Sequence, residues 1–181
     1  MRYVWICFVV LAALLLGFFA WPGRSQSAAS LGAELPARPA AWIISTRPAP
    51  VADSVVAFAL RQLGTGYTYA GSTPATGFDC SGFIQYVFAN FRVPVPHSTA
   101  LLIAAGMPVA REQARRGDIV VFTGTAATAV LPGHAGIVVS EPGQVLRFIH
   151  SSSARRESGV KISQVEGTDY ERRFMQVRRV L

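Results

Sequence analysis

Cysteine is scarce in this chain, and its scarcity excludes several classes of protein at once. Cys7 and Cys80 are the only two among 181 residues, and Cys7 lies in an apolar N-terminal run. If that run serves export, Cys80 is the only thiol of the exported part, and a lone thiol cannot form an internal disulfide. No Cys-x-x-Cys pair is present to bind zinc. Cys80 therefore needs another explanation.

Charged residues are absent from the segment that follows Arg2. Residues 3–21 are an uninterrupted apolar or small run that ends at Pro22-Gly23-Arg24. The run is long enough to approach a membrane span, and its basic start equally suits a cleaved export signal. We predict that residues 1–24 are a signal peptide or a membrane anchor. The protein would then act in the periplasm or cell envelope, either free or anchored in the inner membrane.

The remaining chain divides at a change of composition. Residues 25–52 are rich in Pro, Ala, Ser and Arg without a sustained hydrophobic period, which predicts a flexible or extended tether. From Asp53 onward apolar positions recur regularly, so residues 53–181 are the predicted domain. About 130 residues can bury one hydrophobic core but not two. We find no internal repeat and expect a monomer.

Lysine is nearly absent as well, since Lys161 is the only one and arginine supplies the other positive charges. Removing Arg2 and Arg24 from the net charge of +7 leaves about +5 for the exported part. A basic surface suits an anionic polymer. Nucleic acid is not the expected partner, because no aromatic residues are interleaved with the clustered arginines Arg111, Arg115 and Arg116.

The most informative stretch is Gly77–Tyr86, which reads GFDCSGFIQY. A loop rich in Gly, Ser and Thr turns here into a helix whose apolar positions have helical spacing: Cys80, Phe83, Ile84, Val87, Phe88 and Phe91. Unpaired N–H groups and the dipole at a helix N-terminus favour a thiolate, so we expect a lowered pKa for Cys80 and a nucleophile. The alternative is an inert core cysteine, against which the flanking Asp79, Ser81 and Gly82 argue.

Two of the three histidines provide a base for this thiol. The apolar β-type runs 134–140 and 144–150 are separated by Glu141-Pro142-Gly143, a turn-type connection. A three-residue turn would put His134 directly opposite His150. Cross-strand partners have Cβ atoms about 5 Å apart, so one imidazole could orient the other. Nucleophile, base and orienting residue are the parts of a cysteine hydrolase.

The order of the predicted elements indicates the fold class. Asp53 is the predicted cap of a helix that stops at Gly64. Ser98 is the predicted cap of a short helix that runs through Ala105. Strands are expected at residues 118–123, 134–140, 144–150, 159–163 and 174–180. Helices followed by strands indicate an α+β domain. The nucleophile helix would pack on an antiparallel sheet that carries the base.

Six stretches carry a resemblance to a known family. Their order and rough spacing resemble those of the NlpC-type (NlpC and p-sixty) endopeptidases, papain-like cysteine peptidases that cut peptide bonds in bacterial peptidoglycan. The resemblance covers about residues 51–181. The matching stretches are 67–72 (YTYAGS), 77–83 (GFDCSGF), 95–99 (VPHST), 116–122 (RGDIVVF), 134–137 (HAGI) and 148–151 (FIHS).

The resemblance implies roles for individual residues. Cys80 would be the nucleophile, His134 the general base and acid, and His150 the orienting residue. Tyr67 would line the cleft and, with the Cys80 N–H, could stabilise the oxyanion. The implied contacts to the stem peptide on the acyl side of the scissile bond are Asp79, Ser81 and Ser98. The family requires no metal or cofactor.

Three features depart from the family pattern. Ala70 stands where glycine is usual, so the backbone there must accommodate a Cβ. His97 stands where arginine is common, which changes any contact of that charge with a substrate carboxylate. Residues 123–133 are longer than a tight strand connection requires, and they form either a wall of the cleft or a loose surface loop.

We therefore predict a bacterial cell-wall cysteine endopeptidase that hydrolyses an amide bond in peptidoglycan stem peptides or cross-links. Both the D-glutamyl to diaminopimelate bond and the diaminopimelate cross-link are candidates. One alternative is a catalytically inactive wall-binding module on the same fold, and another is a metal site at Cys80, His134 and His150. With an ordinary pKa for His150 near 6.5, activity would fall as the pH drops through about 6.

Overall fold

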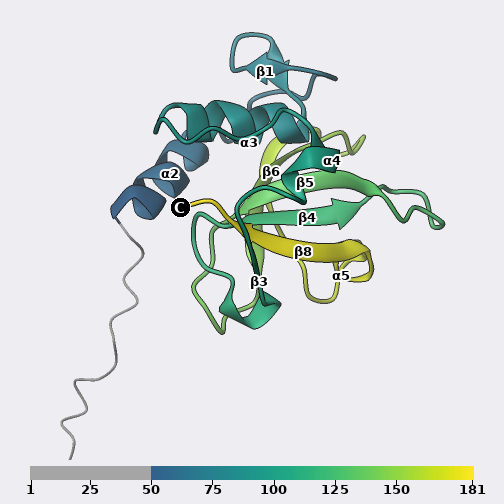
Figure 1. The fold of residues 1–181 in the computed structure, drawn as a ribbon. Coiled ribbons are helices and arrows are strands. Elements are labelled where there is room, and N and C mark those ends of the chain that lie inside the picture. The colour runs from purple at the N-terminus through teal and green to yellow at the C-terminus, as the bar shows by residue number, and fades with distance from the viewer. Residues whose placement is uncertain (1–49) are drawn as a thin grey trace, which may run out of the picture. The chain divides into compact units, whose positions relative to one another are not determined.

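The computed structural model describes residues 50–181, so the predicted signal or anchor and nearly all of the predicted tether lie outside it. Helices precede a sheet in the chain (Figure 1). No helix within residues 50–181 is long and apolar enough to cross a membrane. The helices are α2 (Pro50–Leu60), α3 (Cys80–Ala89), α4 (Thr99–Leu102) and α5 (Asp169–Arg173).

A six-stranded antiparallel sheet forms the second layer, in the order β3-β8-β4-β5-β6-β7. Its strands are β3 (Met107–Val109), β4 (Ile119–Thr123), β5 (Pro132–Val138), β6 (Arg147–Ser152), β7 (Gly159–Gln164) and β8 (Phe174–Arg179). A short hairpin of β1 (Ser72–Thr73) and β2 (Gly77–Phe78) precedes α3. The predicted α+β class is confirmed, with α3 packed on the sheet.

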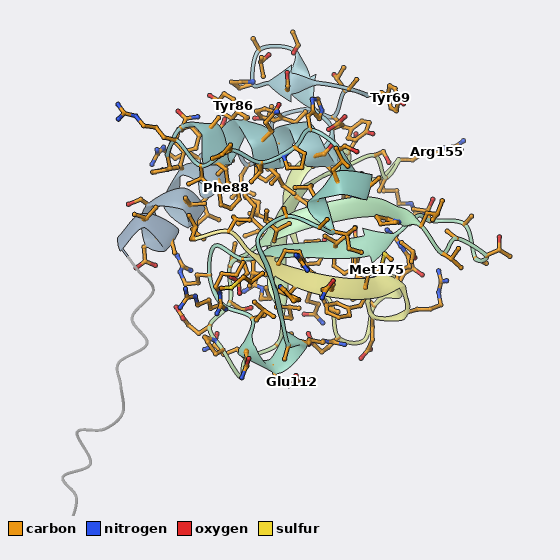
Figure 2. The ribbon with its side chains drawn as sticks, viewed as in Figure 1. Tyr69, Tyr86, Phe88, Glu112, Arg155 and Met175 are labelled. Carbon is orange, nitrogen blue, oxygen red and sulfur yellow. The ribbon has the colours of Figure 1, made fainter. Side chains whose placement is uncertain are left out.

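Apolar side chains cover both faces of this sheet. On one face, the buried residues of α2 and α3 pack against Ala135 and Ile137 of β5, and Figure 2 shows Phe88 on the side of α3 that faces the sheet. On the other face, Phe122 and Phe148 pack together. Because side chains alternate along a strand, His134 lies on the face of Phe122, its partner in β4.

Several predicted boundaries need correction. Helix α2 begins at Pro50, so Asp53 is not its cap; Asp53 lies in the first turn, where its Oδ1 is 3.1 Å from Nε of Arg116. Ser98 does precede α4, but that helix ends at Leu102 and the Ser98 side chain makes no capping hydrogen bond. The helix at Cys80 is confirmed. Strand β3 and helix α5 were not predicted.

The two histidine strands pair in a different register from the predicted one. Ile137 pairs with Ile149 and Val138 with Phe148, a displacement of two residues. Residues 139–146 connect the strands, so the predicted three-residue turn is wrong. The strand predicted at 144–150 is present, but it begins at Arg147 and ends at Ser152. Since the displacement is even, every side chain keeps its predicted face. His134 and His150 become diagonal neighbours instead of direct partners.

Gly136 makes this diagonal arrangement possible. A Cβ at this position would lie 2.5 Å from Cδ2 of Phe148, 2.9 Å from the Ile149 carbonyl oxygen and 3.1 Å from Cβ of His150. No side chain fits between β5 and the rings of β6 at this point. The absence of a side chain leaves room for the His150 ring beside His134.

We predict that Gly136→Ala lowers the free energy of unfolding by about 1–3 kcal/mol, because backbone and rings must move apart to admit the methyl group. Urea unfolding followed by circular dichroism measures the change. Gly66→Ala is the matched control, since a Cβ there would meet nothing within 4 Å. Equal stability of the two variants would contradict the steric role of Gly136.

Candidate active site

Asp79 fixes the start of helix α3 and therefore the position of Cys80. Its backbone is extended, and its Oδ1 accepts hydrogen bonds from the Gly82 N–H at 2.6 Å and from the Ser81 hydroxyl at 3.1 Å. Such an N-cap satisfies a backbone donor that the helix itself leaves unpaired. Cys80 is then the first helical residue, and it is half-buried.

The pKa of the Cys80 thiol is raised above its ordinary value, so the predicted lowering is wrong. Burial is the largest cause, and the negative charge of Asp79 adds to it. Hydrogen bonds from the Ala135 and Ser81 backbone and from the Thr99 side chain favour the thiolate, but they do not offset these effects. The resting cysteine is therefore a neutral thiol. A base must remove its proton during a reaction.

Cys80 lies in a pocket of about 420 Å³ together with four of the residues predicted to contact substrate. Burial raises the pKa of Tyr67, and the neighbouring Cys80 and Asp79 raise it further. The phenol of Tyr67 thus stays protonated and can donate a hydrogen bond. The pocket is lined by Tyr67, Tyr69, Ala70, Asp79, Cys80, Ser81, His97, Ser98, Thr99 and Gly133.

Ala70 and His97, the two residues that depart from the family pattern, both line this pocket. Ala70 has a φ of 57°, a left-handed conformation that costs a residue with a Cβ roughly 1–2 kcal/mol. His97 Nε2 lies 3.1 Å and 3.2 Å from the two carboxylate oxygens of Asp79. His97 therefore ties the segment before α4 to the cap of α3.

His134 and His150 form a hydrogen bond, with Nε2 of His134 2.8 Å from Nδ1 of His150. Nε2 of His150 lies 3.0 Å from Oγ of Ser163, and the His150 side chain is fully buried. The Tyr170 ring lies 5.8 Å from the His134 ring and 5.5 Å from the His150 ring between centroids. One imidazole can thus orient the other, as predicted, but the two residues are diagonal rather than direct neighbours on β5 and β6.

Both histidines are held neutral. Burial lowers the pKa of His134 to about 3, and the charges of Arg173 and Lys161 contribute. Burial, followed by His134, Lys161 and Arg173, lowers the pKa of His150 to about 2. These shifts overturn the expectation that His150 titrates near pH 6.5. No acid limb near pH 6 follows from this residue.

The hydrogen bonds indicate one useful pair of tautomers. When the Nε2–H of His150 donates to Ser163, the Nδ1 of His150 can accept only from the Nε2–H of His134. The lone pair of His134 is then on Nδ1. This nitrogen is the one available to accept a proton.

The Cys80 pocket and His134 adjoin along the backbone at the start of β5. Gly133 lines the Cys80 pocket, and the Ala135 N–H is hydrogen-bonded to Cys80. His134 stands between them in the chain. From β6, the Ser151 hydroxyl donates a 2.7 Å hydrogen bond to the carbonyl of Phe78, which precedes the cap of α3. The backbone that follows His134 and the residue that follows His150 are thereby fixed against the Cys80 segment.

Sequence reasoning missed Ser163 and Tyr170. The contact of Ser163 with His150 depends on the β6–β7 register, in which His150 pairs with Lys161, and no local signal reveals it. Tyr170 belongs to α5, which the side chain of Thr168 caps. A threonine followed three residues later by Glu171 is a capping-box pattern, and it could have predicted this helix.

A metal site has no geometric support within residues 50–181. These residues contain no group of three or more His, Cys, Asp or Glu placed to hold a metal ion. The facing nitrogens of His134 and His150 share a hydrogen bond, so they do not converge on a common third position.

Comparison with known proteins gives the family. Residues 64–179 match the NlpC/P60 family, and the chain belongs to this family. It is 37% identical over 114 residues to the gamma-DL-glutamyl hydrolase of Bacillus subtilis, and 35% identical over 100 residues to a probable endopeptidase of Mycobacterium tuberculosis. These matches cover 62% and 55% of this chain but 26% and 23% of the relatives. The chain therefore spans about a quarter of the length of these curated relatives.

Solved structures share the papain-like α+β fold. An NlpC/P60 family protein from Bacillus cereus has a TM-score of 0.63 and 26% identity, over 74% of this chain and 41% of that chain. RipD from Mycobacterium tuberculosis has a TM-score of 0.58 and 23% identity, over 74% of this chain and 99% of that chain. It is described as a non-catalytic NlpC/p60 domain protein adapted to peptidoglycan binding. The likeness to RipD concerns the fold alone.

The lowered pKa values of the histidine pair predict an acid-sensitive fold. An unfolded chain protonates its histidines near pH 6.5, whereas the pKa of His134 is about 3 and that of His150 about 2 in the folded protein. Between these values the unfolded state binds more protons, so the free energy of unfolding falls as the pH is lowered. We expect this loss between about pH 6.5 and 3.

His150→Asn should reduce the proton uptake on unfolding by about one between pH 6 and 4, as measured from urea unfolding at a series of pH values. Ser163→Ala is the control, because it removes a hydrogen-bond partner of His150 but no titrating ring. That control should lower stability and retain the wild-type slope. A slope unchanged in His150→Asn would contradict the assignment.

Proposed function

We propose that this protein is a cysteine endopeptidase that hydrolyses an amide bond in the stem peptides or cross-links of peptidoglycan. The observation that carries the proposal is the hydrogen-bonded row of His134, His150 and Ser163, which adjoins the Cys80 pocket at the start of β5. Family membership supports a cell-wall hydrolase in general. A purely wall-binding module has no need of a neutral base at the edge of a thiol pocket.

The resting protonation states determine how the reaction would begin. Cys80 is a thiol and His134 a neutral imidazole, so Nδ1 of His134 accepts the thiol proton as the sulfur attacks the carbonyl carbon. His150 accepts the hydrogen bond from Nε2–H of His134 and stabilises the imidazolium that forms. Proton transfer and attack are therefore coupled. A preformed thiolate is not required.

The second half of the reaction returns the proton. The imidazolium of His134 donates it to the leaving amine as the carbon–nitrogen bond breaks, which leaves a thioester on Cys80. A water molecule then gives a proton to the same imidazole and attacks the thioester carbon. The carbon–sulfur bond then breaks, and the imidazolium returns its proton to the sulfur. The products are a carboxylic acid, a free amine and the restored thiol.

The residues around the thiol have proposed roles in binding. The Tyr67 hydroxyl and the Cys80 N–H are the candidate donors to the oxyanion. The contacts proposed for the stem peptide on the acyl side are Asp79, Ser81 and Ser98. Since the Asp79 carboxylate already accepts hydrogen bonds from the start of α3 and from His97, its position before substrate arrives is fixed.

We further propose that the protein acts in the cell envelope. The uncharged run of residues 3–21 behind Arg2 supports export, through a signal peptide or anchor within residues 1–24. Residues 25–52 would then tether the peptidase domain of residues 53–181. Envelope localisation brings the enzyme to its polymeric substrate.

We predict that Cys80→Ala abolishes hydrolysis with an unchanged melting temperature. His134→Ala should lose on the order of a hundredfold to ten-thousandfold in rate, because the base is gone. His150→Asn should lose less, since its amide oxygen can accept the hydrogen bond from His134, whereas His150→Leu cannot. The assay is mass spectrometry of soluble muropeptides after digestion, which also identifies the bond that is cut.

Two outcomes would overturn this assignment. Activity of Cys80→Ala within tenfold of wild type would exclude the thiol mechanism, and a greater loss in His150→Asn than in His134→Ala would exchange the two histidine roles. Binding of muropeptides without cleavage by the wild-type protein would instead favour a wall-binding module.

The pH dependence of the rate provides a separate prediction. Because the pKa of His134 is lowered to about 3, the base stays neutral well below pH 6. We expect kcat/KM of wild type and His150→Asn to have parallel profiles between pH 5 and 7, with folding checked at each pH. An acid limb near pH 6.5 that disappears in His150→Asn would show that His150 titrates in the ordinary range.

A further inference from the structure

A second pocket, of about 360 Å³, borders the other functional ring of the site. Its lining includes Thr125, His134, Ser152, Ser153, Arg155 and Tyr170, and it shares no residue with the pocket around Cys80. Gly133 lines the cysteine pocket and His134 lines this one, so the two pockets adjoin at consecutive residues of β5. The connection from β4 to β5, which projects beyond the strands in Figure 1, contributes Thr125 to the second pocket.

The charges around this second pocket are positive, and most of them are already paired. Arg173 is buried, and its guanidinium donates to the Thr123 carbonyl and to Asp169. Lys161, which lies near enough to His134 to lower its pKa, forms an ion pair with Glu157 at 3.0 Å. Arg173 is therefore part of the pocket wall, and Lys161 is paired outside it.

Arg155 differs from these cations. It is exposed, and within residues 50–181 it forms no ion pair or hydrogen bond. Figure 2 shows its side chain extending outward from the molecule, on the same side of the view as Tyr69 of the cysteine pocket. A guanidinium that lines a pocket and has no partner among the described residues is available to a carboxylate from outside.

We propose that this pocket receives the leaving-group side of the substrate and that Arg155 binds a carboxylate on the residue that supplies the amine. The inference rests on the proposed function, because it takes His134 as the acid that protonates this amine. An acid must lie within hydrogen-bond reach of the atom it protonates. The leaving amine must therefore arrive beside His134, at the mouth of the second pocket.

The chemistry of the substrate suits this arrangement. In both candidate bonds the amine belongs to diaminopimelate, a residue with two amino and two carboxyl groups, so a carboxylate accompanies the leaving nitrogen. The hydroxyls of Thr125, Ser152 and Ser153 supply further polar partners in the pocket. Arg155 would make the enzyme discriminate between diaminopimelate with a free carboxylate and its carboxamide, which carries no charge.

The test uses two soluble muropeptides that differ only in whether this diaminopimelate carboxyl is free or amidated. Wild-type protein should favour the carboxylate in kcat/KM by about tenfold, the value of one hydrogen bond to a charged group. Arg155→Gln should reduce the ratio to within about twofold. Arg156→Gln is the matched control, because Arg156 is the exposed neighbour in the chain and does not line the pocket; it should keep the wild-type ratio.

Equal turnover of the two peptides by wild type, or equal loss of discrimination in Arg155→Gln and Arg156→Gln, would overturn the proposal. If wild type cleaves neither peptide, the proposed function fails. The role of Arg155 in the pocket is then tested separately, by calorimetry of the binding of both peptides to the Cys80→Ala protein. Tighter binding of the carboxylate peptide that is lost in Arg155→Gln supports the assignment. Equal binding of both peptides overturns it.

Discussion

The geometry of this site depends on the carboxylate of Asp79. It accepts the Gly82 N–H that begins α3, and it is paired with His97, while its own N–H donates to the Gly71 carbonyl at 2.9 Å. One residue thus joins the helix, the preceding hairpin and the segment before α4. The same charge raises the pKa of Cys80. The residue that positions Cys80 thus adds to the effect of burial, which is the larger cause of the raised pKa. In the proposed mechanism a neutral base must then take the thiol proton.

The neutral base depends in turn on the packing of the opposite face of the sheet. Phe148 and Tyr170 surround the His150 ring, with centroids 4.8 Å and 5.5 Å away. This apolar enclosure disfavours a charged imidazole and strengthens the hydrogen bond to His134. Ser163 is the polar group that fixes the tautomer. The packing of the core around His150 therefore also determines the protonation state of the site.

Sequence patterns predicted the fold class, the start of α3 and the side chains that gather at the site, because periodicity and capping are local properties. They did not predict the register of β5 and β6, because a period of two specifies the face of each residue and not its partner. The length of the connection 139–146 decided the register. The pKa of Cys80 was predicted with the wrong sign, because the prediction took account of the helix N-terminus but not of burial and the Asp79 charge, which raise the pKa.

The protonated state of Cys80 has a consequence for the lifetime of the enzyme. Peroxides and disulfides react with thiolates much faster than with thiols. Cys80 is the one cysteine within residues 50–181, so no second thiol of the domain could reduce an oxidised sulfur by forming a disulfide. In the proposed mechanism the sulfur becomes nucleophilic only while its proton passes to His134, so it would be open to oxidants as a thiolate for a small part of each cycle. The raised pKa thus provides chemical durability in an oxidising environment.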